Sequence, residues 1–74
     1  MNPHDLLKIQ TALTAYDKRQ AKGKRYNPYA LPQYLEALRD ADEEVSGGRP
    51  LGLALARYFT GSVLDAVKKA VGAP

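Results

Sequence analysis

Residues 2–23 read NPHDLLKIQTALTAYDKRQAKG, and this stretch predicts the fold class. Its apolar side chains recur at spacings of three and four residues, at Leu6, Ile9, Leu13 and Tyr16. This spacing places them on one face of an amphipathic α-helix. Asn2-Pro3 is typical of a helix start, because asparagine caps free backbone N–H groups and proline loses no hydrogen bond at the first helical position. Gly23 predicts that the helix ends near residue 21 or 22.

A second helix is expected to follow the next start signal, Asn27-Pro28. Pro32 disfavours helical geometry at the residue before it, so we expect a short turn at 28–31 and a helix from residue 32. Gly47-Gly48 predicts its end. The side chain that opens its apolar face is either Tyr34 or Leu35.

The last third of the chain predicts two shorter helices. A third helix is expected over 50–60, where apolar residues cover much of the circumference, and Gly52 within it suggests a close helix crossing. Gly61 is expected to close this helix. Ser62 and Asp65, three residues apart, resemble a capping box and predict the start of the fourth helix.

The fold expected from these signals is all-α: a compact bundle of three to four short helices that forms one domain over residues 1–74. A chain of this size buries only about 60% of the surface that its unfolded form exposes, so homo-oligomerisation is a further expectation. Tyr16, Tyr34 and Tyr58 fall on apolar faces. The expected core comprises Leu6, Ile9, Leu13, Leu35, Leu38, Leu55, Phe59, Leu64 and Val67.

Composition argues against catalysis. The chain has no cysteine, one histidine and two serines, which leaves little from which to build a nucleophile, a general base or a zinc site. We therefore expect no enzymatic activity, no cofactor and no metal. Neither a secretory signal nor a membrane-spanning segment is expected, and the lack of cysteine fits a cytoplasmic protein.

Basic and aromatic residues gather in one segment that reaches from the end of the first helix toward the second. It holds five of the eleven lysine and arginine residues, and its tyrosines lie in a connection, where they can meet a partner. The candidate binding residues are Lys18, Arg19, Lys22, Lys24, Arg25, Tyr26 and Tyr29. Two interpretations remain open: the segment faces a ligand, or it faces the acidic stretch 36–44 of the same chain.

Two functional hypotheses follow from this segment. The leading one is a small interaction module that binds or regulates another protein, because tyrosine and arginine are common anchors of protein interfaces. The alternative is a nucleic-acid-binding protein in which the cations contact phosphates and a tyrosine stacks on a base. A membrane-surface role for the fourth helix is not favoured, since that helix is short and carries few cations.

Overall fold

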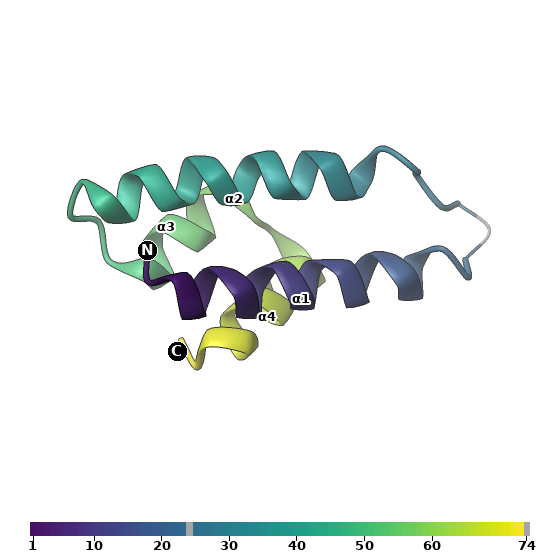
Figure 1. Ribbon diagram of the computed structural model, residues 1–74. Helices are drawn as coiled ribbons and strands as arrows, with labels where there is room; N and C mark the ends of the chain where they lie inside the picture. The colour runs from purple at the N-terminus through teal and green to yellow at the C-terminus, as the bar shows by residue number, and fades with distance from the viewer. Residues whose placement is uncertain (24, 74) are drawn as a thin grey trace.

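The computed structural model describes residues 1–23 and 25–73, which contain helices and loops and no strand. The helices are α1 (Pro3–Gln20), α2 (Ala30–Ser46), α3 (Leu51–Tyr58) and α4 (Gly61–Val71). The two long helices, α1 and α2, run antiparallel, and α3 and α4 pack against the part of this hairpin near the chain termini (Figure 1). The expected all-α bundle of short helices is confirmed.

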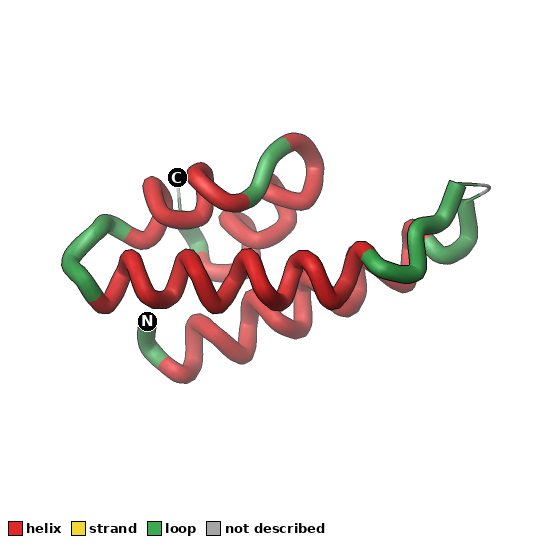
Figure 2. The backbone as a smooth tube through the Cα atoms, turned by 90° about the horizontal axis from the view of Figure 1, so that it is seen from above, coloured by secondary structure: helices red, strands yellow, loops and turns green. Residues whose placement is uncertain are grey.

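The far end of the α1–α2 hairpin projects beyond the two short helices. Figure 2 shows this end standing clear of the rest of the bundle, and it gives the molecule its elongated outline of 39 × 20 × 20 Å. The projecting end consists of the last turn of α1, the connection and the first turn of α2. The basic and aromatic segment therefore lies on a protrusion.

Asn2 is the N-cap of α1, whereas Asn27 lies two residues before Tyr29, the N-cap of α2. Asn2 caps α1 through Oδ1, which accepts a hydrogen bond of 2.7 Å from the backbone N–H of His4. Asn27 Oδ1 accepts one of 2.9 Å from the N–H of Tyr29, and α2 starts at Ala30, two residues before the expected Pro32. Proline is tolerated there because first-turn N–H groups have no acceptor within the helix.

The junction between α3 and α4 differs from the expected one. The third helix ends at Tyr58, Phe59 and Thr60 are extended, and Gly61 opens α4 with a φ of 63°. No side chain caps α4, so the expected capping box at Ser62 is wrong. The Ser62 hydroxyl instead shares a hydrogen bond of 2.6 Å with the phenol of Tyr16, which ties α4 to α1.

The core is built from all four helices and from the extended junction. Most of the expected core residues are buried, and Leu6 and Leu64 pack against the core while partly exposed. Leu35 is the error, because its side chain is 41% exposed. The structure places Tyr34 inward in its stead, with its ring centroid 6.1 Å from Tyr16 and 6.4 Å from Phe59. The buried residues are Ile9, Leu13, Leu38, Ala41, Ala54, Leu55, Phe59, Val63 and Val67.

We predict unequal costs for two leucine truncations on α2. Leu38 is 3% exposed, so Leu38→Ala should lower the free energy of unfolding by about 3 kcal/mol through lost burial and the resulting cavity. Leu35→Ala should cost about 1 kcal/mol or less, since much of that side chain is already in water. Urea unfolding followed by circular dichroism measures both. Equal costs would contradict the orientation of α2.

We also predict opposite effects for alanine at two glycines. Gly61→Ala should destabilise by about 1 kcal/mol, because a side chain disfavours a φ of 63°. A Cβ at Gly52 would meet no atom within 4 Å, so the expected close crossing is absent there. Gly52→Ala should therefore stabilise by about 0.5 kcal/mol through lower entropy of the unfolded chain. Thermal unfolding of the two variants side by side would reveal whether the signs differ.

Candidate functional site

The sequence-predicted binding residues that the structure describes lie together at the projecting end of the hairpin. The side chains of Lys18, Arg19, Lys22 and Arg25 are exposed. Of the two tyrosines, Tyr29 is 72% exposed and Tyr26 is 37% exposed. Lys24 lies outside the described residues. We call this surface the basic end, defined by Lys18, Arg19, Lys22, Arg25 and Tyr29.

The acidic stretch 36–44 runs toward the opposite end of the molecule, because α2 is antiparallel to α1 (Figure 1). Among the described residues, two of its five carboxylates pair with other cations. Asp42 contacts the N-terminal ammonium of Met1 at 2.6 Å, and Glu44 contacts Arg49 Nε at 2.6 Å and Arg57 Nε at 3.3 Å. Within residues 1–23 and 25–73, no ion pair joins the acidic stretch to the basic end.

The carboxylate of Glu44 is stabilised by several donors at once. The neighbouring Tyr58 hydroxyl lowers the pKa of Glu44, burial opposes this, and the charges of Arg57 and Arg49 lower the pKa further. The Glu44 carboxylate and burial in turn raise the pKa of Tyr58. Asp42 and Glu44 are thus paired with cations of the same chain, whereas the cations of the basic end face solvent.

Asp17 is a site residue that the sequence reasoning missed. It is 8% exposed, and its Oδ2 accepts a hydrogen bond of 3.1 Å from the Tyr26 hydroxyl. This bond, followed by burial and by the charge of Asp17, raises the pKa of Tyr26. Position 17 lies one helical turn after Leu13, on the apolar face of α1. A carboxylate on an apolar helix face was the sequence signal that could have identified Asp17 as a site residue.

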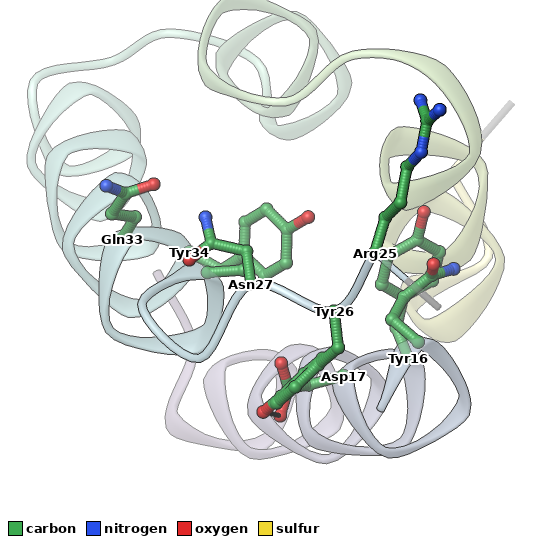
Figure 3. Close-up of a pocket in the computed structure, with 9 residues that line it drawn as sticks. Tyr16, Asp17, Arg25, Tyr26, Asn27, Gln33 and Tyr34 are labelled. Carbon is green, nitrogen blue, oxygen red and sulfur yellow. Dashed lines mark hydrogen bonds between the residues drawn. The ribbon is translucent and has the colours of Figure 1, made fainter. Parts of the chain in front are cut away.

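Tyr26, Asp17 and their neighbours enclose a pocket of about 240 Å³ between α1, α2 and their connection (Figure 3). Three tyrosines contribute to its walls, namely Tyr16, Tyr26 and Tyr34. Burial raises the pKa of Tyr34, and the neighbouring Tyr16 and Asp17 raise it further. The polar lining comes from Asp17, Gln20, Arg25, Asn27 and Gln33.

Arginine side chains flank this pocket without pairing to Asp17. The Arg19 guanidinium carbon lies 5.7 Å from the centroid of the Tyr16 ring, within the range of a cation–π contact. Arg25 lines the pocket, and Figure 3 shows its side chain extending away from the Asp17 carboxylate. The basic end therefore combines exposed cations outside with one buried anion inside.

Elsewhere in the described ranges, the structure shows neither a cluster of possible metal ligands nor a helix that could span a membrane. No three His, Asp or Glu side chains converge there on a possible metal position, and His4 is exposed at the start of α1. None of the helices in residues 1–23 and 25–73 has the length and apolar character needed to cross a bilayer. Comparisons with protein-family models, curated proteins and solved structures found no match for this chain.

The Tyr26–Asp17 hydrogen bond predicts an alkaline loss of stability. The pKa of Tyr26 is higher in the folded chain than its ordinary value of 10.0, so the bond contributes fully below pH 10.0 and is lost as the pH rises through the folded-state pKa. The free energy of unfolding should therefore fall above pH 10.0. Tyr26→Phe should lower stability at neutral pH and flatten this decline.

Urea unfolding at several pH values from about 8 to about 11 checks this prediction. A residual decline is expected in the variant, because the pKa values of Tyr34 and Tyr58 are also raised. Tyr29→Phe is the matched control, since Tyr29 is exposed and contributes only its backbone N–H to the bond with Asn27. Parallel pH profiles for wild type and Tyr26→Phe would refute the assigned bond.

Proposed function

We propose that this chain is a non-enzymatic interaction module that binds an acidic surface of another protein through its basic end. The observation that carries the proposal is the separation of charge along the hairpin. Cations at one end have no acidic partner among the described residues, while Asp42 and Glu44 of the acidic stretch pair with other cations. Unpaired exposed cations are free to pair with a partner at little desolvation cost.

An exposed aromatic side chain beside these cations supports a protein partner. Tyr29 is 72% exposed at the start of α2, next to the connection that carries Arg25. Tyrosine and arginine bury a large area on binding and are enriched among the residues that dominate interface energies. Because the hairpin end projects from the bundle, a partner can contact both helices without clashing with α3 or α4 (Figure 2).

Nucleic acid is the second candidate, and the same unpaired cations favour it. Lysine and arginine gain affinity for phosphates through counterion release, and an exposed ring such as Tyr29 can stack on an unpaired base. Tyr26 is less available for stacking than the sequence suggested, because its hydroxyl is bonded to Asp17. The net charge of +3 is modest for a nucleic-acid-binding protein, so we rank this function second.

We also propose a cellular compartment and an oligomeric state for this protein. We propose a cytoplasmic protein without a cofactor, in keeping with its lack of cysteine. A homodimer is compatible with the exposed Leu7 and Leu53, which are 61% and 60% exposed on α1 and α3. Sedimentation equilibrium measures the oligomeric state directly.

The test compares two triple charge reversals of equal size. Lys18→Glu, Lys22→Glu and Arg25→Glu change the basic end, whereas Lys8→Glu, Arg39→Glu and Lys69→Glu change exposed cations elsewhere. Partners cross-linked in cells and identified by mass spectrometry should be lost with the first triple and with Tyr29→Ala, and kept with the second. An affinity loss of about tenfold or more is expected from three contacts. Equal capture by both triples would refute the proposed surface.

Fluorescence anisotropy with labelled single- and double-stranded DNA and RNA separates the two candidates. Binding that falls steeply between about 50 and about 200 mM salt, and that vanishes in the first triple variant, would support nucleic acid. Nuclease-resistant capture of a protein without such binding supports the protein partner. Circular dichroism of each variant confirms that it is folded.

A further inference from the structure

Asp17 differs from Asp42 and Glu44, which also have a buried carboxylate oxygen, in lacking a cation among the described residues. Within residues 1–23 and 25–73, three carboxylate oxygens are buried without a hydrogen bond: Asp17 Oδ1, Asp42 Oδ1 and Glu44 Oε2. Those of Asp42 and Glu44 lie 2.6 and 3.3 Å from a cationic nitrogen. In the part of the chain that the structure describes, Asp17 has no cationic nitrogen within 4 Å. A buried carboxylate in this state is costly, and pairing it with a cation would stabilise it.

The hydrogen bond between the Asp17 carboxylate and Tyr26 is weak enough to be exchanged. The distance between Tyr26 Oη and Asp17 Oδ2 is 3.1 Å, whereas a hydroxyl bound tightly to a carboxylate lies roughly 2.5–2.7 Å away. Tyr26 belongs to the connection and is 37% exposed, so its side chain can move without disturbing the core. Figure 3 shows this side chain reaching down to the Asp17 carboxylate. A small shift of its hydroxyl away from Asp17, with the ring still lining the pocket, would open the carboxylate to the pocket.

The pocket walls suit a cation attached to a short apolar chain. Tyr16, Tyr26 and Tyr34 supply aromatic rings, whose faces attract cations. The Arg19 guanidinium carbon, 5.7 Å from the centroid of the Tyr16 ring, gives one such contact. The volume of about 240 Å³ is smaller than the roughly 300–1,000 Å³ of pockets for drug-sized ligands. It fits the end of one side chain or a small amine.

We propose that this pocket binds an alkylguanidinium or alkylammonium group, which donates a charge-assisted hydrogen bond to Asp17 and lies among the three tyrosine rings. The group comes either from an arginine or lysine side chain of a partner or from a free polyamine. Gln20 and Gln33 line the same pocket, and their amide oxygens can accept hydrogen bonds from the remaining N–H donors. A small cation alone can occupy this site, so its binding can be tested independently of the proposed binding to an acidic protein.

The exposed cations around the pocket give this binding a distinctive salt dependence. Lys18, Arg19 and Lys22 repel an approaching cation, and added salt screens that repulsion. Cation binding should therefore not weaken between about 50 and about 200 mM salt, whereas binding of an acidic partner to the basic end should weaken. The opposite trends distinguish the two activities.

The experiment is an NMR titration of the full chain with ethylguanidinium and ethylammonium chloride, and with uncharged ethylurea as the control ligand. The wild type should show saturable shifts at the Asp17 carboxyl carbon and the Tyr26 and Tyr34 rings, with a dissociation constant of about 1 mM. Ethylurea should bind at least about tenfold more weakly, because it lacks the charge. Absence of shifts at Asp17 up to about 20 mM, or equal binding of ethylurea, would overturn the proposal.

Three variants assign the site. Asp17→Asn should weaken cation binding by about tenfold or more, while Asp65→Asn, the same change at an exposed position on α4, should leave it unchanged. Tyr26→Phe should tighten it by about threefold, because a competing donor is gone, and this result stands even if Asp17→Asn does not fold. Binding to Arg25→Ala but not to wild type would show that Arg25 closes the pocket, and would overturn the proposal.

Two further ligands identify the source of the cation. A blocked peptide with one arginine between glutamates should bind more tightly than the same peptide with citrulline. If that arginine peptide also exceeds spermidine, a partner side chain is the source, and the reverse order identifies a free polyamine. Failure of both to displace ethylguanidinium would count against the site.

Discussion

The packing of the buried Phe59 ring is the interaction on which the rest of the structure depends. Its ring is 2% exposed, although its backbone lies in the extended junction between α3 and α4. Because the chain bends sharply at Gly61, both short helices turn back onto the long hairpin with Phe59 beneath them. The ring then contacts Tyr34, and Tyr34 contacts Tyr16. A continuous row of aromatic side chains thus connects the core with the pocket.

The antiparallel pairing of α1 and α2 also determines the electrostatics. A sequence in which basic residues are followed by acidic ones suggests that the two groups neutralise each other. In a helical hairpin, however, residues near the connection are neighbours, and residues far along the second helix return to the start of the first. Asp42 therefore meets Met1, and the basic end keeps its charge. Topology, more than composition, leaves this surface available.

The elements of the fold could largely be predicted because helix signals are local. Asn2 and the apolar spacing of α1 were sufficient for that helix, and Gly72, with a φ of 68°, is a signal of the same local kind at the end of α4. Side-chain orientation was harder, since Tyr34 and Leu35 differ by about 100° around the helix and both fit an apolar face. Pro32 was misread because its effect depends on its distance from the helix start.

The site could be predicted only in part, because its two halves rest on different kinds of information. Clustering in sequence was enough to locate the exposed cations of the basic end. The pairing of Asp17 with Tyr26 spans nine residues and a turn, so it appears only once the chain is folded. The junction at Gly61 was mispredicted for a similar reason. Signals for a helix end and a helix start overlap there, and the tertiary packing of Phe59 selects between them.

The projection of the hairpin end has a consequence for how the molecule opens. Its residues lie beyond α3 and α4 and contribute little to the core, so they belong to the least stable part of the structure (Figure 2). The last turn of α1 and the first turn of α2 can separate while the core stays intact. A ligand that bridges them acts as a clamp, because it binds the closed form and shifts the opening equilibrium by mass action. Ligand binding at this end therefore opposes local unfolding of the hairpin, because both change the population of the same closed form.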